Sequence, residues 1–521
     1  MFSRRWNPLP EILQSTRVQG RKSCLAGSCR NAAILLLAVL LVPMPSRAQQ
    51  GKVVVESSEQ LFCVLAALND AGYDTGVGSD TGSKVRDAVR ADLAARHIPI
   101  ATDIQRFYEA HRVAGNPGRD LGQYISLALL LGPPPDFKFT VAAADLPPDA
   151  KNVAGLVPLL KIFYKQADLA DLWARASVDA HSAIARYSAP VRRSIQLTDA
   201  YLRFPAGSYL GRTYTIYLDL LGAPNQVQAR IYGSNYYLVI TPSKKMRISD
   251  IRHQYLHFLL DPLAVKYGSE IHQSVALLAL ARKAPALRSD FKADFSLLVT
   301  ECLIRAAELR MDKVPAPEAT KQIGQMTATG LILVPYFYDA LQGFEKQESS
   351  MSGYYEQMIE GINPAEEAIR LGKVKFTKPA RPVAAAPGLS EKERLLDQGD
   401  NGIYSGNYSG AKAAFEQVLT KDPKSERALY GMAVVASSTG KPDLARKYFE
   451  ETLDNARDLR IVTWSHIYLG RLDDVDGNRK KALAQYRAAS LTAGRYPEAL
   501  QAVEKGLKEP FGFEFQPPPG R

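Results

Sequence analysis

The chain contains little cysteine and little histidine, with 4 and 7 residues of these types among 521. Cys24 and Cys29 lie in an N-terminal leader, so only Cys63 and Cys302 belong to the remaining chain. Both stand in apolar, helix-like surroundings, where either a disulfide between them or two buried thiols fits the pattern. The sequence also lacks a CxxC pair, a Walker loop and a serine-nucleophile elbow, which leaves those common catalytic designs without their residues.

The first 48 residues form this leader, which is basic and then apolar. Six Lys/Arg residues precede the apolar run Ala32–Val42, and Ser46-Arg47-Ala48 supplies a small-residue cleavage motif. This order is typical of a secretory signal peptide, and eleven apolar residues are too few to span a bilayer comfortably. We therefore predict cleavage after Ala48, an exported protein (periplasmic or secreted), and no stable membrane anchor after cleavage.

The leader also carries much of the positive charge of the chain. It holds seven Lys/Arg and one acid, so its removal lowers the formal net charge from +11 to +5. So small a net charge on more than 470 residues argues against a nucleic-acid-binding protein.

Residues 49–372 have the pattern of a mostly helical α+β domain. Helices are expected up to about Pro190, and the run of aromatic and β-branched residues that follows predicts a small antiparallel sheet. Its strands are expected at Thr213–Leu220, Gln226–Tyr232 and Tyr236–Thr241. Two helices should follow the sheet. The first is expected to begin at an N-cap, Ser249, and to end at Asp261-Pro262, and the second to cover about Ser289–Arg310.

A Pro/Ala-rich linker at 373–389 separates this domain from a repeated segment at 390–508, and a flexible tail is expected at 509–521. The repeat has a small residue, a second small residue and an aromatic at periods of 34 and 37 residues: Gly406, Ala411 and Phe415; Gly440, Ala445 and Phe449; Gly477, Ala482 and Tyr486. The segment resembles three tetratricopeptide (TPR) units, a family of stacked helical hairpins. The resemblance implies a groove that binds a protein or peptide partner.

Two histidines stand four residues apart in the sequence I-R-H-Q-Y-L-H-F-L-L-D-P, as His253 and His257. On a helix they share one face, where both imidazoles can hold one zinc ion. Two ordinary helix histidines remain the alternative at this point. Glu301 lies in a nearly all-apolar segment, and a buried carboxylate needs a metal or a partner such as Arg305.

Between about Thr213 and Arg310, a sheet, an H-x-x-x-H helix and a later helix with an acid follow one another. In this order the segment resembles the gluzincin branch of the zincin metallopeptidases. The resemblance implies His253, His257 and Glu301 as ligands of one zinc. Arg305, four residues after Glu301, is placed to orient that carboxylate. Competing third ligands are Asp261, Glu270 and His272.

The position of the catalytic glutamate in that family is occupied here by Gln254. An amide cannot carry the proton from metal-bound water to the leaving group, and a positioned general base contributes about 10²–10⁴-fold in rate. The sequence therefore predicts a pseudo-peptidase domain joined to a protein-binding or scaffolding repeat. The alternative is an active zinc metallohydrolase whose base comes from elsewhere, with Glu270, Glu308 and Asp261 as candidates.

Overall fold

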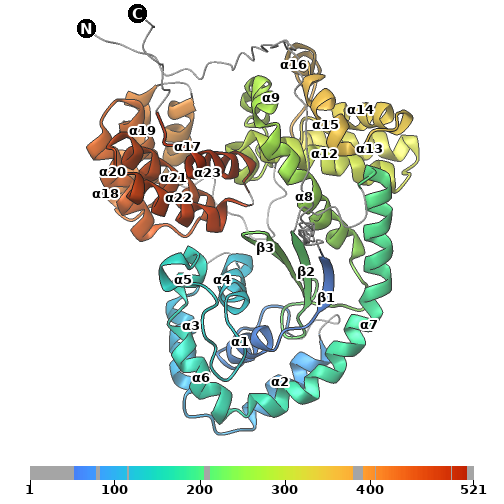
Figure 1. Cartoon of the computed structure of the whole chain (residues 1–521), viewed down its shortest axis with the longest axis vertical. Coiled ribbons are helices and arrows are strands. Elements are labelled where there is room, and N and C mark those ends of the chain that lie inside the picture. The colour runs from blue at the N-terminus through green and yellow to red at the C-terminus, as the bar shows by residue number, and fades with distance from the viewer. Residues whose placement is uncertain are drawn as a thin grey trace, which may run out of the picture. The chain divides into compact units, whose positions relative to one another are not determined.

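The computed structural model describes residues 52–77, 83–113, 117–204, 212–378, 391–404, 407–494 and 496–512 (Figure 1). These residues all belong to one compact unit, Ala48–Arg521. The predicted leader, most of the predicted linker, Gly406 and most of the tail lie outside the described residues. The expected fold class is confirmed, since the described residues form 23 α-helices and one small sheet. None of these helices is both long and apolar enough to cross a membrane.

The first helices enclose a core of their own. Helix α1 is almost wholly buried in it and begins at a serine cap, where Ser58 accepts a hydrogen bond from the backbone of Leu61. The helices up to the sheet are α1 (Glu59–Asp70), α2 (Lys84–Ala94), α3 (Ala101–Ala110), α4 (Pro117–Leu129), α5 (Pro148–Asn152), α6 (Leu156–Gln166) and α7 (Leu169–Leu202).

Helix α7 differs from the expectation that helices end near Pro190, because it runs through this proline for 34 residues. Its first half contributes Leu172 and Ala176 to the core around α1. Its second half contributes Tyr187 and Ile195 to a second core, built on the sheet and the helices after it. Helix α7 therefore connects the two cores, as Figure 1 shows by its length.

The sheet is mixed, and the expectation of a purely antiparallel sheet is wrong. Its strands are β1 (Lys52–Glu56), β2 (Thr213–Leu218), β3 (Val227–Tyr232) and β4 (Asn235–Ile240), in the order β1-β2-β4-β3. Only the hairpin of β3 and β4 is antiparallel, and β2 pairs in parallel with both β1 and β4. The three later strands lie where their residues predict them, whereas β1 precedes its partner by more than 150 residues and was not expected.

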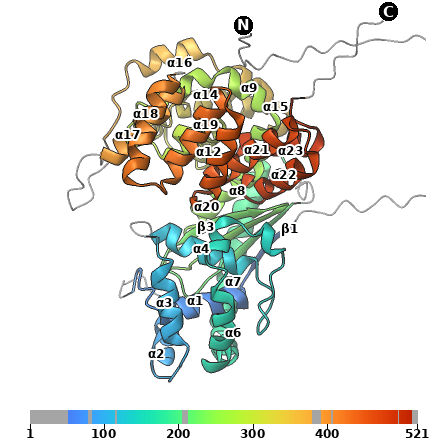
Figure 2. The same cartoon turned by 90° about the vertical axis from the view of Figure 1, so that its left-hand side faces the viewer.

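The sheet separates the two cores (Figures 1 and 2). On one face Tyr214, Ile216 and Leu238 pack into the second core, while Val239 packs into the core around α1. This alternation follows from the strand period of two, which points successive side chains to opposite faces.

The helices after the sheet begin with α8, which carries the histidine pair. The expected segment Ser289–Arg310 is divided at Asp294, whose carboxylate caps α12 by accepting from the backbone of Leu297. The group comprises α8 (Ile248–Lys266), α9 (Gly268–Gln273), α10 (Leu278–Ala281), α11 (Ser289–Ala293), α12 (Phe295–Met311), α13 (Ala316–Thr329), α14 (Val334–Lys346), α15 (Met351–Glu360) and α16 (Pro364–Leu371).

The last helices form hairpins in the region expected to hold the repeat. The second helix of each hairpin carries a buried small residue and a buried aromatic, for example Ala411 and Phe415. Gly440 and Gly477 adopt left-handed φ values of 70° and 75° at turns within hairpins, where glycine is favoured. The helices are α17 (Glu391–Tyr404), α18 (Tyr408–Lys421), α19 (Glu426–Ser438), α20 (Pro442–Asn455), α21 (Leu459–Val475), α22 (Arg479–Ala493) and α23 (Pro497–Lys508).

Candidate metal centre

Helix α8 is longer at both ends than its sequence predicts. It starts at Ile248, so Ser249 is not the cap, and it continues through Pro262 to Lys266. Proline has no N–H for the carbonyl one turn earlier, which belongs to Phe258. The guanidinium of Arg212 donates to this carbonyl, with Nη1 2.7 Å from the oxygen, and thereby replaces the missing helical bond.

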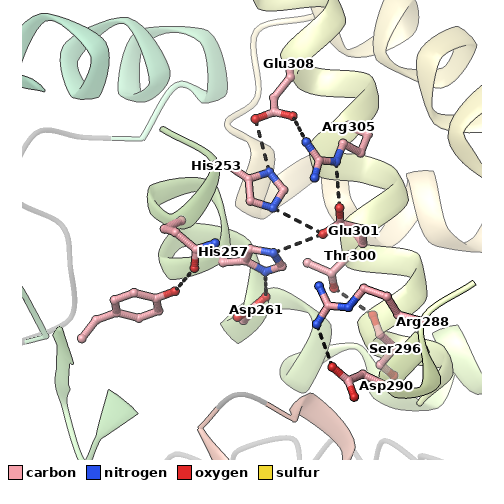
Figure 3. Close-up of polar contacts among 12 residues, drawn as sticks. His253, His257, Asp261, Arg288, Asp290, Ser296, Thr300, Glu301, Arg305 and Glu308 are labelled. Atoms are coloured by element: carbon pink, nitrogen blue, oxygen red, sulfur yellow. Dashed lines mark hydrogen bonds and ion pairs between the residues drawn. The ribbon is translucent and has the colours of Figure 1, made fainter. Parts of the chain in front are cut away.

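The histidine pair faces α12, as Figure 3 shows. The Nε2 atoms of His253 and His257 lie 3.4 Å and 3.3 Å from one atom, Oε2 of Glu301. All three potential ligand atoms are within 4.8 Å of one another. The structure thus brings together the three residues that the sequence proposes as ligands.

The other ring nitrogens are also paired, each with a carboxylate behind the ring. Nδ1 of His253 lies 3.2 Å from Oε1 of Glu308, and Nδ1 of His257 lies 3.0 Å from Oδ1 of Asp261. A carboxylate that accepts from Nδ1 leaves the Nε2 lone pair directed forward, as in histidines that bind metal ions. Both rings are therefore oriented with Nε2 toward Glu301.

These contacts also show where the alternative candidates for the third ligand and for the general base lie relative to the cluster. Asp261 and Glu308 lie behind the rings, where neither can act as a third ligand or as a base at the front of the cluster. Glu270 and His272 stand on α9 and are not among the three clustered residues, and Glu270 accepts from the hydroxyl of Ser269. The expected contact of Arg305 is present, since its Nε lies 2.8 Å from Oε1 of Glu301.

The charges of the cluster support one another. Burial disfavours the charged form of His253, but hydrogen bonds to Glu301 and Glu308 outweigh it and raise the pKa of this imidazole. Burial acts in the same way on His257, whose pKa is nevertheless raised to about 9, chiefly by the charge of Asp261. Burial would raise the pKa of Glu301, but the two histidines hold it well below its usual value. The cluster alone is a network of ion pairs.

The donor set fits a zinc ion. Ligand atoms ~2.0–2.1 Å from a tetrahedral zinc lie roughly 3.3–3.4 Å apart, which matches both spacings between imidazole nitrogen and carboxylate oxygen in the cluster. The chemistry of the set, two imidazoles and one carboxylate, also suits zinc with one position open. Zinc bound there would polarise a ligand in that open position.

Gln254 lies beside the cluster and is held by a strand residue that sequence reasoning missed. The hydroxyl of Tyr236 on β4 donates to Oε1 of Gln254 at 2.9 Å. Gln254, His253, Arg305 and Glu308 all line a cavity of about 680 Å³. The sequence signal for Tyr236 was weak, because one tyrosine in an aromatic-rich strand does not stand out from its neighbours.

In a comparison with known proteins, one segment of the chain matches a family model. Residues 403–462 match the family model of the tetratricopeptide repeat. The chain matches no curated protein and no solved structure. The repeat predicted from the spacing of small and aromatic residues is therefore confirmed within 403–462, which contains the anchor residues of the first two predicted units.

Proposed function

We propose that the chain is a binding or scaffolding protein, in which tetratricopeptide repeats hold a protein or peptide partner and a zincin-like domain binds one zinc ion without efficient peptide hydrolysis. Tetratricopeptide repeats commonly mediate protein–protein contacts, and stacked helical hairpins provide an extended surface for them. We further propose that residues 1–48 direct export, from their order of basic, apolar and small residues.

The observation that carries the pseudo-peptidase proposal is the amide at position 254 next to a complete set of ligand atoms. The Nε2 atoms of His253 and His257 lie 3.4 Å and 3.3 Å from the carboxylate of Glu301, as two ligands of one tetrahedral zinc would, and all three atoms lie within 4.8 Å of one another. The neighbouring side chain can form hydrogen bonds but cannot exchange a proton near neutral pH. Such a domain keeps the binding capacity of a zinc site and loses its proton-transfer step.

The geometry disfavours an active hydrolase that uses a non-standard base. A general base must reach the water within about 2.6–3.2 Å. Asp261 and Glu308, the two candidates near the cluster, instead contact the rear nitrogens of His257 and His253.

The test is the zinc content and peptidase activity of the purified chain beginning at Gln49. We expect about one zinc per chain by elemental analysis, and no cleavage of casein. The double variant His253→Ala/His257→Ala should lose the zinc, while the control His272→Ala, which changes an exposed histidine on α9, should retain it. Zinc-dependent cleavage of casein by the unaltered chain would refute the pseudo-peptidase proposal, and zinc bound equally by the double variant would refute the metal site.

A further inference from the structure

The amide of Gln254 presents a hydrogen-bond donor to the cavity. Its Oε1 is occupied by the hydroxyl of Tyr236. Its Nε2 has no hydrogen-bond partner among the described residues, although the side chain lines the cavity. A glutamate at this position would offer an acceptor to the cavity instead. The substitution therefore reverses the hydrogen-bonding character of the cavity wall next to the histidines.

Arg288 adds a second set of donors to the same cavity. This side chain is 67% exposed, and its Nη2 lies 2.7 Å from the carboxylate of Asp290, two residues away. A guanidinium has five N–H donors, so this pairing leaves several available. Arginine is suited to carboxylates because two parallel N–H groups match the two carboxylate oxygens.

The acidic residues that line the cavity are already neutralised by neighbouring cations. Glu308 contacts His253 and Arg305, at 3.2 Å and 3.1 Å. Asp312 accepts from both terminal nitrogens of Arg252 at 2.6 Å. Asp250 lies 2.7 Å from Arg247. An anionic ligand would therefore meet paired carboxylates and the available donors of Gln254 and Arg288.

Apolar side chains complete the wall of the cavity. They come from the edge strand β3, from the end of α12 and the turn after it, and from α13: Val227, Ala229, Leu309, Val314 and Met326. A ligand with one carboxylate and apolar side chains would satisfy both kinds of surface. The end of a peptide chain has this chemistry, and about 680 Å³ is sufficient for small ligands of this size.

We propose that this cavity binds the free C-terminal carboxylate of a peptide, with the Gln254 amide and the Arg288 guanidinium as its hydrogen-bond donors. This inference rests on the proposed function, in which the side chain at position 254 forms hydrogen bonds and does not act as a base. It assigns the ligand class of the domain: peptide ends with apolar side chains.

The experiment compares N-acetyl-Leu-Leu with its C-terminal amide by isothermal titration calorimetry against the chain beginning at Gln49. The titrations are made with the zinc-loaded chain and with the chelator-treated chain. The acid should bind at least about tenfold more tightly than the amide, as expected for hydrogen bonds to a charged group. Equal binding of acid and amide, or no binding of the acid, overturns the inference.

Three variants identify the donors. Arg288→Ala should remove most of the preference for the acid, and Gln254→Glu should reduce it because a carboxylate replaces the donor. Arg106→Ala is the matched control, since Arg106 is 72% exposed and pairs with Asp103, three residues away. A preference that Arg288→Ala leaves unchanged overturns the inference.

Zinc content and casein cleavage are measured on the same samples, which separates the two proposals. If the chain binds zinc, leaves casein intact and shows no preference for the acid, only the inference fails. If zinc is absent and the acid is still preferred, the metal site fails and the carboxylate site stands.

Discussion

Among single residues, the side chain at position 254 has the largest chemical consequence. Glutamine and glutamate have nearly the same shape, so Gln254 occupies the place next to His253 that a catalytic carboxylate would occupy. The hydroxyl of Tyr236 fixes the amide oxygen at 2.9 Å. Position 254 therefore holds a preorganised side chain that cannot carry a proton.

The variant Gln254→Glu should gain zinc-dependent peptidase activity, because it restores a carboxylate beside an otherwise complete set of ligand atoms. We expect an increase of about 10²–10⁴-fold over the unaltered chain, measured with a quenched fluorescent peptide library. Gln254→Ala should bind the same amount of zinc and remain inactive. A zinc-loaded Gln254→Glu chain without activity would show that more than the base is missing.

The sequence predicted the three clustered residues but not the roles of the residues around them. His253 and His257 could be found because a four-residue spacing places both on one helical face. The sequence could not show which ring nitrogen points forward, and this depends on Asp261 and Glu308. From the sequence alone both acids are therefore candidate general bases, and Asp261 is also a candidate ligand. In the structure both contact the Nδ1 atoms and orient the rings from behind.

Among the secondary-structure elements, α8 shows how a proline can lie inside the helix that carries the histidines. Pro262 should have ended the helix, yet the Phe258 carbonyl receives a hydrogen bond from Arg212, which stands just before β2. The same guanidinium lies 4.3 Å from the centre of the Phe258 ring. A side chain from outside the helix thus completes its hydrogen bonding.

Arg212→Ala should lower the free energy of unfolding by about 1–3 kcal/mol, because it removes the hydrogen bond that the Phe258 carbonyl accepts from outside the helix. Urea denaturation followed by circular dichroism measures the change. The same substitution in a Pro262→Ala background should cost less, since alanine supplies the missing backbone N–H. Equal costs in the two backgrounds would contradict this role of Arg212.

Helix α12 has a cap whose charge is unfavourable in the folded protein. Asp294 is fully buried, and burial together with the charge of Glu498 on α23 raises its pKa to about 7, although Arg460 acts in the opposite direction. The folded state thus binds a proton on this carboxyl more tightly than the unfolded state does. The contribution of Asp294 to stability should therefore fall as pH rises from about 4 to about 7.

Asp294→Asn removes this charge and keeps a good helix cap. We expect equal thermal stability of the two proteins near pH 4, and a gain of about 1–3 kcal/mol for the variant at pH 8. Thermal unfolding between pH 4 and pH 8 measures the difference. Asp290→Asn, which changes a partly exposed acid nearby, should show no such dependence.

Elements were predicted best where one local pattern decides their type. The strands β2, β3 and β4 are examples, since residue types alone favour them. Strand direction depends on the path of the chain between strands, so the parallel pairing of β2 with β1 and β4 could not be read locally. The predicted C-terminal end of α8 was wrong because a distant arginine offsets the effect of Pro262.

The whole molecule contains several separate hydrophobic cores. Two lie on opposite faces of the sheet, and smaller ones lie between the helices α17–α23. The repeat also contacts the helices that carry the candidate ligands: α23 packs against α8 and α12, and the hydroxyl of Ser296 lies 3.3 Å from Oε1 of Glu498. The sequence predicted the repeat and not these contacts, because no pattern within one segment specifies what packs against it.

Gly431→Ala should damage the repeat while the zinc site remains intact. A methyl group at Gly431 would lie 2.3 Å from the ring of Phe415, and such overpacking costs about 1–3 kcal/mol. We expect faster trypsin cleavage within 391–508 and unchanged zinc content. Gly324→Ala is the control, because nothing lies within 4 Å of a methyl group at that position on α13. Loss of zinc in Gly431→Ala would show that the repeat and the site unfold together.

The two buried thiols give each large core its own chemical reporter. Cys63 lies in the core around α1 and Cys302 in the core between the sheet and α12, so they are free and stand on opposite sides of the sheet. Burial raises the pKa of both, which keeps them unreactive while the cores stay closed. The rate at which a thiol reagent labels each cysteine in dilute urea would therefore measure how often the core around that cysteine opens, independently of the other core. The native chain would thus show, without any engineered probe, which of the two cores unfolds first.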